Sequence, residues 1–161
     1  MTQKRNLVEK LIGWIPGYKG YNARETRRDT DRLLREAIVR SLDRPRTAID
    51  EAIADASRRQ RFDHIESLEL LRRTLSTAAD RLRLAPAGYS GFFDASKVDV
   101  AELDAIQEHD ERLRELAERI GSASDGLRNA DETSIDAVRG AIADLENALR
   151  ARDDLVKGLG D

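Results

Sequence analysis

Apolar residues recur at intervals of three and four along most of the chain, which is the pattern of amphipathic α-helices. In residues 2–15 the apolar side chains share one helical face, and Trp14 borders it: Leu7, Val8, Leu11, Ile12 and Ile15. Pro16 ends this segment because the residue before a proline is pushed out of the α region. The pattern predicts an amphipathic N-terminal helix over residues 1–15, followed by a turn that contains Gly17 and Gly20.

Residues 22–83 are predicted to form highly charged helices. Asn22 and Glu25 have the spacing of a capping box, and Pro45 is predicted to mark a break. Apolar stripes follow at helical spacing: Leu33, Leu34, Ala37, Ile38 and Leu42, then Ile49, Ala52, Ile53 and Ala56, then Ile65, Leu68, Leu71 (or Arg72), Leu75, Ala78 (or Ala79) and Leu82. The last two stripes do not share a phase, and Asp63 and Glu66 resemble another capping box. We expect a kink or short break near residues 59–63, and whether 46–83 is one helix stays open.

Residues 99–157 are predicted to form a helical hairpin. Asp99 and Glu102 resemble a capping box, and the first helix is expected to end between Gly121 and Gly126. The second is expected to begin near Thr133 or Ser134. Its apolar residues keep a strict three–four spacing, which we call the C-terminal seam: Ile135, Val138, Ile142, Leu145, Leu149, Val156 and Leu159. Such a seam is typical of a coiled coil and is a candidate surface for self-association.

Two charged residues occupy positions that these stripes reserve for apolar side chains. Asp110 lies between Ile106 and Leu113, and Arg152 fills the odd position of the C-terminal seam. A carboxylate directed into a helix interface is a buried polar group that fixes register, or a wet edge of the interface. An alternative is a metal or acid–base site that Asp110 forms with His109.

Six of the seven aromatic residues lie in or beside two glycine-containing turns. Trp14, Tyr18 and Tyr21 accompany the first, and the loop 86–97 carries Tyr89, Phe92 and Phe93. We interpret the loop aromatics as a cap on the end of a helical hairpin, where they would bury area that the aliphatic stripes do not supply. If they are exposed instead, they would form a contact site for a partner.

These elements predict an all-α protein, an elongated antiparallel helical bundle with coiled-coil-like hairpins and four to six helices. The length of 161 residues fits one domain over residues 1–161. Charged residues make up 37% of the chain and aromatic residues 4%, a mix that favours long, exposed helices over a compact α/β enzyme.

The composition excludes several kinds of chemistry and indicates where the protein is expected to reside. The chain has no cysteine, so disulfides, thiolate metal sites and cysteine nucleophiles are excluded. Glu9 and Lys10 interrupt the first apolar stretch, so we expect no secretory signal, and no apolar run approaches the length that spans a bilayer. We therefore expect a cytoplasmic protein, with a possible peripheral position on the inner membrane face.

Charge is distributed unevenly along the chain. Residues 1–46 carry 12 Lys or Arg and 6 Asp or Glu, whereas residues 47–161 carry 16 and 25. This asymmetry favours a polar molecule whose N-terminal part meets an anionic partner, although long helices also carry many charges without any such role. Acidic residues interleave the arginines of residues 24–36, a pattern that disfavours a nucleic-acid partner.

The sequence offers little support for catalysis or for a cofactor. Neither His64 nor His109 follows a glutamate by three residues, as a di-iron bundle requires. The glycines form no phosphate-binding loop, and Ser90 lacks the spacing of a nucleophile elbow. We therefore predict no catalytic residue, no metal site and no cofactor.

The N-terminal helix is the strongest functional feature of the sequence. Residues 1–21 carry four Lys or Arg against one Glu, and an apolar face with interfacial aromatics is typical of a helix that lies in a membrane surface. The predicted membrane or partner contacts are Lys4, Leu7, Val8, Leu11, Ile12, Trp14, Ile15, Tyr18 and Tyr21. The alternative is that this face packs on the bundle, as amphipathic helices usually do.

Two signatures, the segment 15–21 (IPGYKGY) and the segment 88–94 (GYSGFFD), carry a resemblance to known proteins. In these segments and in the charged helices between them, the chain resembles a family of uncharacterised helical bacterial and archaeal proteins. The resemblance implies a prokaryotic accessory protein without enzymatic activity, and it implies no role for any single residue.

These observations predict a non-enzymatic structural or interaction protein. It would dock on an anionic membrane surface or on a protein partner through its N-terminal helix. The main alternative is a soluble oligomeric scaffold or adaptor whose first helix is part of the core, with self-association through helical surfaces. A third reading is a metal-binding or catalytic bundle that uses His64, His109 and Asp110.

Overall fold

All regular secondary structure in the described ranges is helical. The computed structural model describes residues 24–85, 100–129 and 131–158. Within these ranges the elements are α2 (Arg24–Ser41), α3 (Asp43–Arg58), α4 (Phe62–Leu84), α5 (Val100–Ser124), the 3-10 helix η1 (Asp125–Asn129) and α6 (Glu132–Gly158). The predicted all-α class is confirmed.

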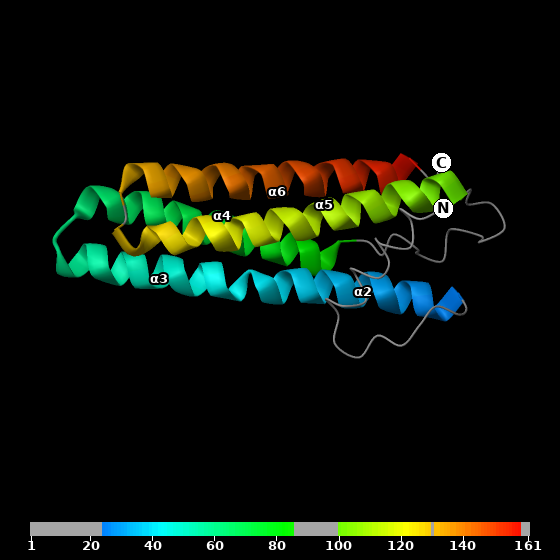
Figure 1. Ribbon diagram of the computed structural model, residues 1–161, viewed down its shortest axis with the longest axis horizontal. Coiled ribbons are helices and arrows are strands. Elements are labelled where there is room, and N and C mark those ends of the chain that lie inside the picture. Colours follow the sequence, from blue (N-terminus) through cyan, green and yellow to red (C-terminus); the bar gives the residue numbers. More distant parts are fainter. Residues whose placement is uncertain (1–23, 86–99, 130, 159–161) are drawn as a thin grey trace.

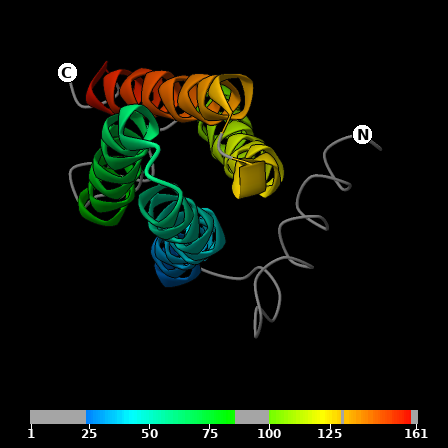
Figure 2. The same ribbon diagram turned by 90° about the vertical axis from the view of Figure 1, so that its left-hand side faces the viewer.

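Four helical arms run along the long axis of the molecule (Figure 1). Helices α2 and α3 follow one another and form the first arm, and α4, α5 and α6 form the other three. Seen from the end where α3 turns into α4, the first arm lies diagonally opposite α6, and α4 lies diagonally opposite α5 (Figure 2). The arrangement is a four-cornered bundle around one core.

The bundle is built from two antiparallel hairpins. The first arm and α4 form one hairpin, and α5 and α6 form the other. Across the two hairpins, α4 packs against α6 and the first arm packs against α5, and in both cases the neighbours run in the same direction. The predicted antiparallel pairing therefore holds within each hairpin, whereas the neighbours between hairpins are parallel.

The apolar stripes read from the sequence form the core of this bundle. One cluster contains buried side chains from every described helix, including η1, and almost all of them are aliphatic. Of the predicted stripes, Ile38, Ile49, Leu68 and Leu113 are fully buried, and Leu33, Ile53 and Ile65 pack against the cluster as partly buried residues. Helical periodicity thus identified the buried faces of the described helices correctly.

The first arm is interrupted at Leu42, three residues before the predicted break at Pro45. Helix α3 already begins at Asp43, so Pro45 lies buried in its first turn. The backbone N–H groups of a first turn have no partner within their own helix, so a proline costs little there. The backbone N–H of Arg46 donates to the carbonyl of Leu42 at 3.1 Å, which continues the chain from one helix into the next.

The predicted break near residues 59–63 is confirmed, and it is a complete reversal of the chain between α3 and α4. The N–H of Gln60 donates to the carbonyl of Ser57, and the N–H of Arg61 donates to the carbonyl of Ala56 at 2.9 Å. This pair of bonds is a Schellman motif, which places its C′ residue in the left-handed region. Gln60 has that conformation, with a φ of 56°.

The predicted capping box of Asp63 is wrong. Helix α4 starts at Phe62, its N-cap is Arg61, and that residue makes no side-chain capping bond. Asp63 instead lies inside the first turn, where its negative charge is favourable beside the positive end of the helix dipole. The reversal is therefore closed by the C-terminal cap of α3.

The α5–α6 connection differs slightly from the sequence prediction. Helix α5 passes through Gly121 and ends at Ser124, and η1 then carries the buried Leu127. Helix α6 begins at Glu132 because Asp131 caps it: the backbone N–H of Ser134 donates to the Asp131 carboxylate at 2.8 Å. This hydrogen bond lowers the pKa of Asp131, and the nearby charges of Arg61 and His64 lower it further.

The strained backbone at Gln60 predicts a stabilising substitution. Gln60→Gly should raise the free energy of unfolding by about 1 kcal/mol, because glycine adopts a positive φ without the steric cost of a Cβ. Urea unfolding followed by circular dichroism measures this. Gln60→Ala is the control, since it shortens the side chain but keeps the Cβ, and it should give no such gain. A loss of stability in Gln60→Gly would contradict the assigned turn.

The cap at Asp131 predicts a pH dependence. Because its pKa is lower in the folded state, its stabilising contribution is complete above the unfolded-state value of about 3.9 and is lost as the pH falls through the folded-state pKa. Asp131→Asn keeps an oxygen acceptor but does not titrate, so its melting temperature should fall less than that of the wild type in this acidic range. An Asp131 pKa at or above the ordinary value in an NMR titration would contradict the prediction.

Candidate functional site

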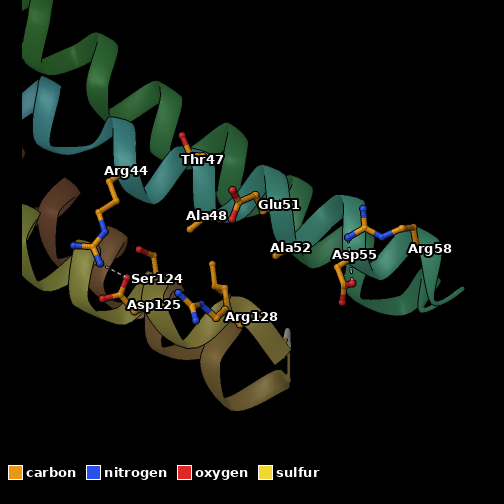
Figure 3. Close-up of a pocket in the computed structure, with 11 residues that line it drawn as sticks. Arg44, Thr47, Ala48, Glu51, Ala52, Asp55, Arg58, Ser124, Asp125 and Arg128 are labelled. Carbon is orange, nitrogen blue, oxygen red and sulfur yellow. Dashed lines mark hydrogen bonds and ion pairs between the residues drawn. The ribbon is translucent and has the colours of Figure 1, made fainter.

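A charged cleft between α3 and η1 is the candidate site, with a volume of about 610 Å³ (Figure 3). One wall comes from a single face of α3, because its lining residues recur at helical spacing. The other wall comes from the end of α5 and from η1. The lining residues are Arg44, Thr47, Ala48, Glu51, Ala52, Asp55, Arg58, Ser124, Asp125, Leu127 and Arg128.

The floor of the cleft is small and buried. Ala52, Ser124 and Leu127 are each exposed by only a few per cent. The hydroxyl of Ser124 donates to the carbonyl of Gly121 at 2.7 Å, so it is engaged within its own helix. The alanine side chains of α3 leave the space that forms the hollow, and the long charged side chains stand around it.

Ion pairs close parts of the rim. Arg44 of α3 donates to the carboxylate of Asp125 in η1 at 2.6 Å, and this contact joins residues 81 positions apart in the sequence. Asp55 accepts a hydrogen bond from Arg58 at 3.3 Å and forms an ion pair with Arg59 at 2.8 Å. The arginines of these pairs are largely exposed and Asp55 is partly exposed, so each pair contributes at most about 1 kcal/mol to stability.

The middle of the cleft retains charges of both signs. Glu51 projects from the α3 wall and Arg128 from the η1 wall (Figure 3), and neither forms an ion pair with any residue that the structure describes. Ligand pockets usually have a predominantly apolar lining with few polar groups. This cleft is suited to polar contacts with a charged surface or segment of a partner.

A second polar feature, a buried ion pair between α5 and α6, lies inside the bundle. The Nε of Arg152 donates to the Oδ1 of Asp110 at 2.8 Å, and the side chains of these residues are only 1% and 9% exposed. Both charged positions of the predicted stripes are therefore directed into the helix interface, as expected for Asp110. That the two residues pair with each other was not predicted.

Three charged residues of α5 form a third polar cluster. Arg114 donates to Glu111 at 2.6 Å and to Glu118 at 2.5 Å, and Glu111 is itself buried. The hydrogen bond to Glu111 raises the pKa of Arg114 above its ordinary value, and the hydrogen bond to Glu118 raises it further. The guanidinium therefore stays charged, and the cluster serves the structure of the helix.

The structure does not bring the two histidines together. His64 lies at the start of α4, where the guanidinium of Arg61 is 3.0 Å from its Nε2. His109 lies 15 residues before the end of α5, about 20 Å along the helix axis. Asp110, the third member of the predicted metal or acid–base site, is engaged with Arg152.

The predicted contact residues lie outside the described ranges. These are Lys4, Leu7, Val8, Leu11, Ile12, Trp14, Ile15, Tyr18 and Tyr21 at the N-terminus, and Tyr89, Phe92 and Phe93 in the loop 86–97. The proposed capping residues Asn22 and Asp99 lie there as well. Their predicted roles stay predictions.

Two further observations apply to residues 24–85, 100–129 and 131–158. None of the helices in these ranges is long and apolar enough to cross a bilayer. Likewise, no three His, Asp or Glu side chains of these residues are grouped in a way that could hold a metal ion.

Sequence reasoning did not identify the cleft, because its two walls come from segments that are distant in the chain. The run from Arg44 to Arg58 reads as the solvated face of a helix, and the small residue Ala52 reads as part of an ordinary apolar stripe. The only local signal is that alanines replace larger apolar residues there. Nothing in the sequence indicates that η1 faces them.

The buried pair predicts an asymmetric response to substitution. Asp110→Ala should lower the free energy of unfolding by about 3 to 5 kcal/mol, because it removes the carboxylate that compensates a buried guanidinium. Asp144→Ala is the matched control: Asp144 pairs with Arg119 across the same two helices at 2.8 Å, but both side chains are about half exposed. Asp144→Ala should lower the free energy of unfolding by no more than about 1 kcal/mol. Equal effects in urea unfolding would contradict the assigned burial.

Comparison of the sequence with family models and with curated proteins, and of the fold with solved structures, gives no match. The resemblance of segments 15–21 and 88–94 to a family of helical prokaryotic proteins therefore stays a prediction.

Proposed function

We propose that this protein is a non-enzymatic structural or interaction protein, a helical bundle that docks on an anionic membrane surface through its N-terminal amphipathic segment. The single observation that supports this proposal most directly is the core. Helices α2 to α6 form one continuous cluster of aliphatic side chains, and most of their charged residues lie on the outside. Such a bundle is a rigid body that can carry contact segments at its surface.

The basic and apolar residues of segment 1–21 indicate the kind of partner that this segment contacts. Four basic residues and one acidic residue accompany the apolar stripe of Leu7, Leu11 and Ile15, and Trp14 borders it. Apolar area provides insertion into the interface, and basic residues provide attraction to anionic headgroups. We propose a peripheral position on the inner face of a cytoplasmic membrane, because that leaflet carries anionic lipids that attract basic segments. A groove on a protein partner would use the same apolar face.

The charged cleft fits this function as a second contact surface. Glu51 and Arg128 offer complementary charges to a polar segment of a partner protein, while the aliphatic core stays closed beneath them. In this proposal the bundle works by presenting surfaces, and no residue has a catalytic role.

Vesicle flotation tests the proposal with point variants of the full chain. The wild type should float with phosphatidylcholine vesicles that contain phosphatidylglycerol, and it should float less at high salt. With vesicles of phosphatidylcholine alone it should remain in the bottom fraction. Leu11→Asp should abolish flotation because it places a charge on the apolar face. Asn6→Asp is the matched control, since it adds the same charge on the opposite face, and it should reduce flotation only slightly.

The same variants separate membrane contact from packing. Trp14 is the only tryptophan of the chain, so a blue shift of its emission on addition of anionic vesicles reports insertion. If the wild type does not float and Leu11→Asp lowers the melting temperature of the bundle, the N-terminal helix belongs to the core and the membrane proposal is wrong. If the wild type does not float and both variants melt normally, a protein groove replaces the membrane as the candidate partner.

A further inference from the structure

The Asp110–Arg152 ion pair occupies one level in a continuous ladder of side chains between α5 and α6. Moving three residues along each antiparallel helix from this pair brings Leu113 opposite Leu149. The next levels set Ala117 against Leu145 and Ile120 against Ile142. All of these side chains are buried in the same core cluster. One register therefore matches the charged positions to each other and the apolar positions to each other.

Other registers of the same hairpin separate the two charges. A shift of one heptad in either direction would set Asp110 against Leu145 or Leu159. The same shifts would set Arg152 against Leu103 or Ala117. Each shift keeps apolar residues in contact along the rest of the ladder, so the apolar pattern alone discriminates poorly between registers. A register that buries the Arg152 guanidinium without its carboxylate is strongly disfavoured, so the ion pair distinguishes the correct register from the others.

The same reasoning applies to pairing between two chains. The C-terminal seam has the strict spacing of a coiled coil, and the sequence marks it as a surface for self-association. In the structure the part of this seam from Ile135 to Leu149 is buried in the core, where α6 packs against α5 and α4. Two copies of α6 that paired through it would bury two Arg152 side chains, one from each chain, without the Asp110 carboxylate.

We propose that the Asp110–Arg152 pair selects the partner of α6. It directs the C-terminal seam to α5 of the same chain in a single register, and it excludes association of α6 with a second copy. The role resembles that of a single buried polar residue in a coiled coil, which specifies register and oligomeric state at a cost in stability. The proposal is independent of the membrane function, because it concerns only the interior of the bundle.

The test replaces both charges with apolar residues of similar size. Asp110→Leu combined with Arg152→Met leaves no buried charge behind at these positions, so the double variant should fold and keep its helix content. We expect a new association that increases with protein concentration in sedimentation equilibrium. We also expect several amide peaks for single residues of α5 and α6 in NMR spectra, which report more than one register.

The matched control makes the same two changes at the exposed ion pair of these helices. Arg119→Met combined with Asp144→Leu adds equal apolar groups across α5 and α6, where the wild-type atoms are also 2.8 Å apart. It should keep the mass distribution and the single set of peaks of the wild type. A gain of association in the control as large as in the double variant would overturn the proposal, since surface hydrophobicity would then be the cause.

A charge-swapped variant, Asp110→Arg with Arg152→Asp, completes the test. It restores one acid and one base at the same level and should show the wild-type mass and a single set of peaks. The proposal is overturned if the apolar double variant is indistinguishable from the wild type in both measurements. It is also overturned if the double variant does not fold, because the pair would then be required for folding itself.

Discussion

Asp110 and Arg152 lie at 2.8 Å from each other among the aliphatic side chains of the core, and the cost of separating them constrains the helices around them. In our proposal this pair fixes α5 relative to α6 along their length. The other two arms then pack on this hairpin, α4 against α6 and the first arm against α5. An error in the α5–α6 register would therefore misplace the surfaces on which both remaining arms rest.

Charged contacts also connect the arms at other levels. Arg35 of α2 donates to the carbonyl of Ala85 at the end of α4 at 2.6 Å, and Arg81 of α4 lies 3.5 Å from Asp153 of α6. At the opposite end, Arg44 connects α3 to η1. Helices that pack only by aliphatic stripes can slide along one another, and directional contacts at both ends oppose such sliding. The rigid body that the proposed function requires depends on both kinds of contact.

The sequence predicted those parts of the fold that depend on periodicity. The stripes through Ile38, Leu75 and Ile142 identified the buried faces, because a helix that buries one side must repeat apolar residues every three to four positions. Caps were less predictable: the pattern at Asp63 suggested a capping box, whereas the Schellman motif at Gln60 needed a glutamine in a conformation that favours glycine. The cleft was not predictable, because the contact of Arg44 with Asp125 depends on how separate helices pack. The Asp110–Arg152 pair was predictable only in part: aligning the two stripes so that their charged positions coincide gives the observed register.

The described surface also limits how the bundle itself can contact a partner. Its exposed large hydrophobic side chains are Phe62, Leu70 and Leu84, all on α4. They are about 12 and 21 Å apart along the helix axis, so they form no continuous apolar patch among the described residues. Strong insertion into a bilayer needs contiguous apolar area, which residues 4–15 supply in the sequence. The proposed function therefore assigns insertion to that segment, and it assigns charged contacts, such as those available at Glu51 and Arg128, to the bundle.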